Sequence, residues 1–76
     1  HPSVTILPIT SELRDAPLFR IAIEPSAENG LRKPSQVMVD KAHTVPREKL
    51  SDPIGRLEDD VLLGTTRALA VFVGIA

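Results

Sequence analysis

A strand-like alternation of side chains in residues 35–40 limits the fold of this chain more than any other feature. Two valines alternate there with glutamine, methionine and aspartate, and this two-residue period is typical of a strand with one buried face. Residues 18–24 show the same alternation, with three apolar residues on one face. A tight turn at Asn29–Gly30, where both residue types tolerate positive φ, would return the later strand antiparallel to the earlier one.

The remaining pattern predicts more sheet and a single helix that covers it. Residues 3–10 are apolar on both faces, and Pro8 marks a sheet edge or the strand's end because proline cannot donate to a ladder. Residues 58–73 combine an acidic first turn with one apolar stripe, which predicts a helix. We therefore expect a mainly β fold with a C-terminal helix. Its strands would be 3–10, 18–24, 35–40 and 54–57, with residues 41–46 leaving the sheet and 47–50 forming a single helical turn.

The length and composition predict one small domain, residues 1–76. A core of this size is marginal and favours pairing with a second copy of the chain. The sequence has no cysteine, and its two histidines, one of them at position 1, make no metal site. No apolar run approaches the roughly 20 residues of a membrane span. Because the sequence opens with His1-Pro2-Ser3 rather than methionine, we expect further chain before it.

Charge and aromatic content exclude some classes of nucleic-acid-binding protein. The net charge is −1, from 9 basic and 10 acidic side chains, whereas a general nucleic-acid coat needs a basic surface. Two phenylalanines are the only Phe, Tyr or Trp residues, which is too few for a base-stacking platform. A local basic groove stays compatible with the sequence, and Arg14 in the polar loop 11–17 is a candidate part of it.

Four short motifs follow one another along the chain. The first predicted strand ends in Pro-x-Thr-Ser at residues 8–11, and a later strand ends in Asp40 followed by His43-Thr44-Val45. The segment Ile54-Gly55-Arg56-Leu57 then precedes the helix, which closes in the run RALAVFVGIA at residues 67–76. In this order and spacing the motifs resemble the MazF/PemK family of toxin–antitoxin toxins over nearly the whole chain.

The resemblance implies both a fold and a function. The fold would be a small SH3-like barrel of the MazF/PemK/CcdB type with an added C-terminal helix, incomplete at the N-terminus because the family's opening strands are absent from the sequence. The function would be that of a cytoplasmic, homodimeric toxin that cuts single-stranded RNA sequence-selectively. Such toxins are metal-independent endoribonucleases and need no cofactor. A cognate antitoxin would inhibit the toxin by laying an acidic, flexible segment over the RNA groove.

The resemblance also implies catalytic residues. Thr10 and Ser11 match the family's hydroxyl pair, which helps to hold the scissile phosphate. Asp40 matches a carboxylate that serves the PemK branch as a base near the attacking 2′-hydroxyl. The sequence departs from the family at two places: Met38 stands where the PemK branch has a catalytic arginine, and the opening "RPAVVV" segment with its arginine is absent.

Arg14, Arg20 and His43 are the candidate RNA-binding residues. The arginines could contact phosphates, and His43 could also transfer protons near neutral pH. Each candidate has a plainer interpretation, because scattered arginines and a loop histidine are commonly just solvated. In the same way, Asp40 could form a turn, and the hydroxyls of Thr10 and Ser11 could cap the loop through bonds to the backbone.

Two other functions stay open at this point. A CcdB-like toxin of related fold binds DNA gyrase without catalysis. Its functional tail ends in Trp-Gly-Ile, where this chain has Val73-Gly74-Ile75-Ala76, so the missing tryptophan favours the nuclease. The third possibility is a truncated, inactive fragment that only dimerises and binds the antitoxin.

Overall fold

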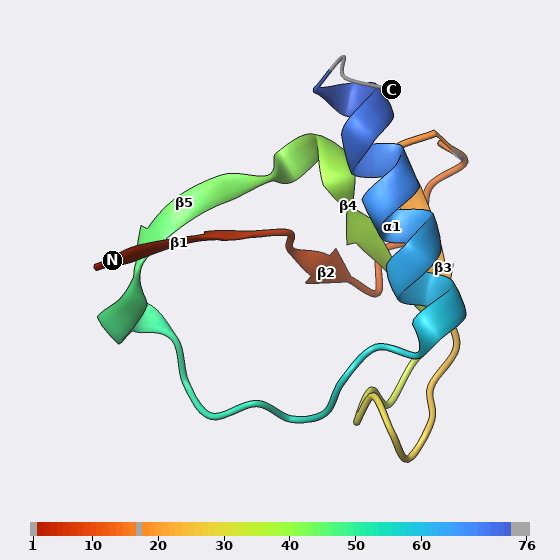
Figure 1. The fold of residues 1–76 in the computed structure, drawn as a ribbon. Coiled ribbons are helices and arrows are strands. Elements are labelled where there is room, and N and C mark those ends of the chain that lie inside the picture. Colours follow the sequence, from red (N-terminus) through yellow and green to blue (C-terminus); the bar gives the residue numbers. More distant parts are fainter. Residues whose placement is uncertain (1, 17, 74–76) are drawn as a thin grey trace.

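A computed structural model describes residues 2–16 and 18–73 of the chain, and within them it shows a mainly β fold closed by one α-helix (Figure 1). The predicted fold class is therefore confirmed. No helix in these residues is both long and apolar enough to cross a membrane. The elements in chain order are β1 (Ser3–Ile6), β2 (Ile9–Thr10), β3 (Arg20–Ile23), β4 (Ser35–Met38), the 3₁₀ turn η1 (Val39–Lys41), β5 (His43–Pro46), the 3₁₀ turn η2 (Arg47–Lys49) and α1 (Asp59–Phe72).

The strands pair in two antiparallel sheets, one of the order β2-β4-β3 and one of β1 with β5. Strand β4 is central in the larger sheet, where Gln36 lies between Thr10 of β2 and Ala22 of β3. Further along β4, Met38 lies opposite Arg20. The predicted antiparallel return of the later strand onto the earlier one is confirmed.

The core lies between the larger sheet and helix α1. Ile23, Val37 and Val39 are at most 2% exposed, and the helix packs Val61 and Leu69 against them. Full burial of such side chains contributes about 1.5–3 kcal/mol each to folding. Figure 1 shows α1 lying over β3 and β4. The apolar stripe predicted for the helix therefore faces the sheet. Along the strands, the side chains that alternate with the core residues must lie on the face of the sheet that points away from α1.

Three predicted strands are shorter than expected, and of residues 18–24 only β3 (Arg20–Ile23) forms a strand. The stretch 3–10 is divided into β1 and β2 because Pro8 has no N–H to donate, although its carbonyl still accepts a hydrogen bond from Met38 N–H. The stretch 35–40 leaves the strand conformation after Met38. Val39 N–H donates to the carbonyl of Phe19, which lies in the turn just before β3. The residues after Val39 therefore have no strand beside them, and they form a 3₁₀ turn.

The predictions for residues 41–46 and 54–57 are wrong. Residues 43–46 form β5, a strand paired with β1, which the sequence pattern did not show because most of its side chains are exposed. Residues 54–57 form no strand, since they run beside the turn at Glu28–Asn29, where Arg56 N–H donates to the Glu28 carbonyl. The predicted helical turn after residue 46 is confirmed as η2.

Asn29 is the centre of a hydrogen-bond network that ties this turn to the start of the helix. The residue is 4% exposed, and its Oδ1 accepts hydrogen bonds from the backbone N–H groups of Ser26 and Leu31. Its Nδ2 donates to the Glu24 carbonyl and to the carboxylate of Glu58, the residue just before α1. The sequence predicted a positive φ in this turn, and Gly30 has a φ of +72°.

We expect the stability of the protein to fall in acid partly through Glu58. The hydroxyl of Ser26 donates to this carboxylate and, with further hydrogen bonds from the backbone and Asn29, lowers the pKa of Glu58 below its ordinary value of 4.5. A pKa that is lower in the folded state stabilises the fold above pH 4.5, and this contribution is lost as the pH falls through the folded-state pKa. Thermal unfolding from pH 3 to pH 7 should therefore show a shallower acid decline for Glu58→Gln than for the wild type, and parallel declines would contradict the assignment.

Candidate functional site

Polar side chains collect on the face of the larger sheet that lies opposite helix α1. The core residues Ile21 and Val37 face the helix, so strand alternation places Thr10, Gln36 and Arg20 on the other face. Three of the residues predicted for the site, Thr10, Arg20 and Asp40, are thereby brought to one side of the sheet or to its end. On this side of the sheet the polar groups form two clusters, one at the end of β2 and one just beyond the end of β4.

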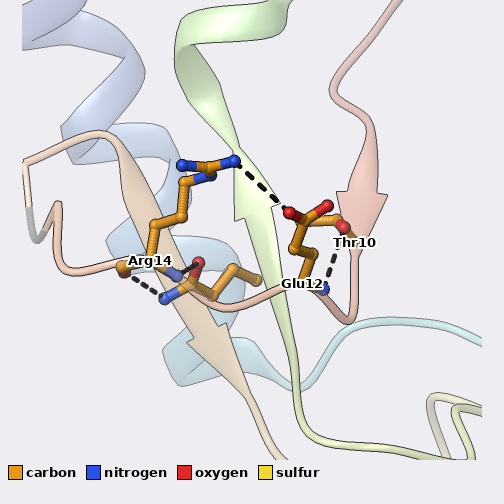
Figure 2. Close-up of polar contacts among 4 residues, drawn as sticks. Thr10, Glu12 and Arg14 are labelled. Carbon is orange, nitrogen blue, oxygen red and sulfur yellow. Dashed lines mark hydrogen bonds and ion pairs between the residues drawn. The ribbon is translucent and has the colours of Figure 1, made fainter.

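The first cluster is at the end of β2 and consists of Thr10, Glu12 and Arg14, which Figure 2 shows together. Thr10 Oγ1 accepts a hydrogen bond from the backbone N–H of Glu12 at 3.0 Å. Arg14 Nη2 lies 3.3 Å from Glu12 Oε1, in an ion pair whose side chains are 63% and 78% exposed. Such an exposed pair contributes at most about 1 kcal/mol, so a phosphate can replace the Glu12 carboxylate as the partner of the guanidinium.

Thr10 keeps a free donor in this arrangement. A hydroxyl has one O–H to donate and two lone pairs to accept with, and the Glu12 N–H occupies one lone pair. No acceptor for the O–H is found in the part of the chain that the structure describes. The turn from Thr10 to Glu12 thus fixes Oγ1 at the strand end and leaves its hydrogen available to an incoming anion. Ser11 follows directly and is exposed at the start of the loop.

Gln36 is a member of the site that the sequence did not single out. Its Oε1 accepts a hydrogen bond from the backbone N–H of Arg14 at 3.0 Å, and its Nε2 donates to the Arg14 carbonyl at 2.8 Å. The two residues are 22 positions apart. The alternation in residues 35–40 could have predicted the face on which Gln36 lies, but no local pattern predicts its partner.

The second cluster is an ion pair between Asp40 and Arg20. Arg20 Nε lies 3.3 Å from Asp40 Oδ1, and the side chains are 9% and 31% exposed. This Oδ1 atom is buried and accepts no hydrogen bond of good geometry within the described residues, so its contact with the guanidinium is an ion pair and not a hydrogen bond. The carboxylate is thus held by one oxygen, and the rest of the group faces solvent. Arg20, which we predicted to bind RNA, is largely enclosed at this place.

His43 belongs to the smaller sheet, at the start of β5 and opposite Ile6 of β1. Its Nδ1 is 2.9 Å from the carbonyl oxygen of Lys41. A carbonyl only accepts, so Nδ1 carries the hydrogen and Nε2 is left as the acceptor of a neutral ring. The side chain is exposed, which leaves Nε2 accessible to a ligand.

The two clusters are separated by Met38. Positions 36 and 40 are four residue steps apart, two with the rise of a strand and two with that of a 3₁₀ turn, which corresponds to roughly 10 Å along the chain. A short ligand with a charged phosphate backbone could therefore contact Thr10 and Arg14 at one end and the carboxylate of Asp40 at the other. Among residues 2–16 and 18–73, no group of three or more His, Asp or Glu side chains is arranged to hold a metal ion.

Comparisons with known proteins give this face a context. The chain is 50% identical over 74 residues to a protein of Mycolicibacterium smegmatis named "Probable endoribonuclease MazF", and the match covers 97% of this chain and 68% of that protein. Its fold superposes on the Mycobacterium tuberculosis toxin MazF-mt6 with a TM-score of 0.85 and 28% identity, over 100% of this chain and 74% of the other. A crystal structure of an Mtb toxin gives a TM-score of 0.80 and 30% identity over 93% and 75%.

A family model agrees with these relatives. The model for the PemK-like, MazF-like toxin of type II toxin–antitoxin systems matches residues 1–73, which is almost the entire chain. The motifs at residues 8–11, around Asp40 and at 54–57 all fall inside this match, and residues 74–76 of the closing motif lie outside both the match and the described residues. The chain therefore belongs to the PemK-like, MazF-like toxin family of type II toxin–antitoxin systems.

Proposed function

We propose that this chain is an endoribonuclease toxin and that it cuts single-stranded RNA on the face that carries Thr10 and Asp40. Two observations together support the proposal. The chain is 50% identical to a protein named a probable MazF endoribonuclease, and it carries the free hydroxyl donor of Thr10 and the exposed guanidinium of Arg14 beside the end of β2. A carboxylate paired with a largely enclosed arginine lies just beyond the end of β4, the strand that pairs with β2. Nucleic-acid cleavage without an external cofactor needs these group types.

The proposed reaction uses the RNA's own 2′-hydroxyl as nucleophile. The carboxylate of Asp40 takes the proton from this hydroxyl, the 2′-oxygen attacks phosphorus, and the bond from phosphorus to the 5′-oxygen breaks. Thr10 O–H, with Ser11 beside it, donates to the non-bridging oxygens as negative charge builds on the phosphorane. The leaving 5′-oxygen takes a proton from solvent water and departs as a hydroxyl, the proton on Asp40 returns to solvent, and the other product carries a 2′,3′-cyclic phosphate.

The RNA-binding residues of the proposal are Arg14 and His43. Arg14 can exchange the Glu12 carboxylate for a phosphate, and Nε2 of His43 can accept from a base or a ribose hydroxyl. Arg20 keeps a different role, because only 9% of its side chain is exposed and it pairs with Asp40. In this proposal it positions the carboxylate instead of contacting the RNA.

The direct test is incubation of a mixed-sequence RNA with the purified chain in the presence of a metal chelator. We expect discrete fragments that end in 2′,3′-cyclic phosphate and begin with a 5′-hydroxyl. Fragments with other ends, or cleavage that stops when the chelator is added, would exclude the proposed chemistry. An intact RNA together with inhibition of DNA gyrase would support a non-catalytic toxin instead.

Asp40→Asn is expected to lower kcat for RNA cleavage by about 10²–10⁴-fold, the usual size of a general-base contribution. Asparagine has nearly the same shape but cannot take the proton from the 2′-hydroxyl. The change also removes the counter-ion of Arg20, so thermal unfolding has to be measured beside the kinetics. A folded Asp40→Asn variant with wild-type kcat would show that another group acts as the base.

The partners in this proposal are an antitoxin and a second copy of the chain. Helix α1 keeps apolar side chains outside the core, and an apolar groove of about 370 Å³ lies between the end of the helix and β1, lined by Thr5, Ala42, Leu69 and Phe72 among others. An apolar surface of this kind on a small domain favours association. We propose a cytoplasmic homodimer, and sedimentation equilibrium of the chain alone would test it by giving twice the mass of 8.2 kDa.

A further inference from the structure

Gln36 joins two parts of the site that would otherwise be independent. It lies in the middle of β4, opposite Thr10 across the ladder, and its side-chain amide bonds to both polar groups of the Arg14 backbone. A side-chain amide that donates to and accepts from the backbone of one residue makes the same pair of hydrogen bonds as a neighbouring residue in an antiparallel sheet. The loop after β2 is therefore fastened to the central strand through a side chain.

The loop has few other attachments to the fold. In the described chain, the remaining hydrogen bonds of residues 11–15 join near neighbours, such as Glu12 N–H to Thr10 and Arg14 to Glu12. Leu13 is 56% exposed, so the loop does not anchor itself by burying its largest apolar side chain. A loop with local bonds and little buried area opens easily, and its conformation depends on the contacts that reach a rigid element.

Arg14 benefits directly from this attachment. Its guanidinium is on a flexible side chain that is 63% exposed, and only its backbone is fixed by Gln36. Fixing the backbone limits the positions that the charge can reach and keeps it on the same side as the Thr10 hydroxyl. A group that is held in place before the ligand arrives loses less conformational entropy on binding.

We infer that Gln36 is a positioning residue for RNA binding, which acts by holding the backbone of Arg14 so that its guanidinium meets the phosphate beside Thr10. The inference rests on the proposed nuclease function, but its structural half does not. It predicts that loss of the Gln36 amide weakens RNA binding only as far as Arg14 contributes to that binding.

The structural half is tested without RNA, by hydrogen exchange of the Arg14 amide in the full chain. This amide is bonded to Gln36 Oε1 and should exchange at least tenfold faster in Gln36→Leu than in the wild type, while the amides of the β3–β4 ladder keep their rates. In Gln36→Glu the acceptor is retained, so protection of this amide should be largely kept. Unchanged exchange in Gln36→Leu would overturn the inference even if the chain proves to be a nuclease.

The functional half is a double-mutant cycle on KM for a short RNA. We expect Arg14→Ala to raise KM by about tenfold, the usual size of one lost charge-assisted hydrogen bond, and Gln36→Leu to raise it by a similar factor with kcat little changed. In the Arg14→Ala background, Gln36→Leu should raise KM less than twofold further, because both changes remove the same contact. Multiplying effects would overturn the proposed route through Arg14, and a wild-type chain that cuts no RNA would fail the proposed function while leaving the exchange result valid.

Discussion

Gly55→Ala is expected to destabilise the protein by about 3 kcal/mol or more, as the largest overpacking effects do. A Cβ on residue 55 would overlap the backbone carbon of Asn29 and lie 2.5 Å from the carbonyl oxygens of Asn29 and Glu28. These are backbone atoms, so no side chain can turn aside to make room. For a domain of this size the loss corresponds to a fall in Tm of roughly 12–24 °C.

The turn cannot move away because it is held from several sides. The carbonyl of Glu28 accepts from Arg56 N–H, and the side chain of Asn29 is buried with bonds to four groups. Gly30, the next residue, has φ +72°, and a Cβ there would in turn overlap the carbonyl oxygen of Ile54. The turn and the segment around Gly55 therefore pass each other backbone to backbone, and only glycine fits on either side.

Gly64→Ala is the matched control for this prediction. Its added Cβ would lie 3.8 Å from Ile21 Cγ2, which is ordinary van der Waals contact, and residue 64 is inside helix α1. Because alanine is the better helix former, this variant should be more stable than the wild type by up to about 1 kcal/mol. Equal thermal unfolding of Gly55→Ala and the wild type would show that the two backbones are not in contact.

The same contact explains one failure of the sequence prediction. Residues 54–57 contain spaced apolar residues, and their pattern resembles a short strand. The pattern could not reveal that Gly55 is required by the close approach of Asn29, which comes from a turn that is distant in sequence. Residues 54–57 pack against the turn through this close backbone contact and not through a ladder of strand hydrogen bonds, so they do not form a strand.

Strand prediction succeeded where burial and alternation coincide and failed elsewhere. The pattern found β3 and β4 because Ile23 and Val37 are in the core. It missed β5, whose pairing with β1 is made by the backbone while the side chains of His43 and Thr44 stay exposed. A pattern of apolar residues reports burial, and a strand that pairs without much burial leaves little trace in it.

For the candidate site, the sequence offers candidate residues but not their contacts. Thr10 and Asp40 are candidates because of their position at strand ends and because of the family motifs. The partner of each depends on the fold: the side chain of Arg20, predicted to meet RNA, is enclosed against Asp40, and Gln36 holds a loop residue 22 positions away. Such pairings follow from strand register, which single-sequence patterns specify only indirectly.

Thr10→Val is the second change with a large expected effect, a loss of about 10²-fold or more in kcat for RNA cleavage. Valine has the shape of threonine but no O–H, and the loss of one preorganised donor to a developing oxyanion costs about 10²–10³-fold in other enzymes. KM should change much less, because the proposed donor acts mainly on charge that appears in the transition state. Single-turnover cleavage of a short RNA at saturating protein measures the chemical step directly.

The interpretation depends on separating the donor from the turn, since Thr10 Oγ1 also accepts the Glu12 N–H. That N–H is at an exposed turn where water can replace the acceptor. The free energy of unfolding of Thr10→Val should therefore lie within about 1 kcal/mol of the wild-type value. Thr10→Ser keeps both the donor and the acceptor and should retain kcat within a few-fold. Ser51→Ala, which removes a hydroxyl from the exposed segment before the helix, should match the wild type.

The pattern across these variants identifies the role of the hydroxyl. Loss in Thr10→Val with recovery in Thr10→Ser, at similar stability, requires a donor at this atom. Equal loss in both variants would point to packing of the whole threonine side chain at the strand end, because serine keeps the O–H and valine keeps the methyl group. Wild-type kcat in Thr10→Val would remove Thr10 from the chemistry and leave the phosphorane to Ser11 and Arg14, which follow it in the same loop.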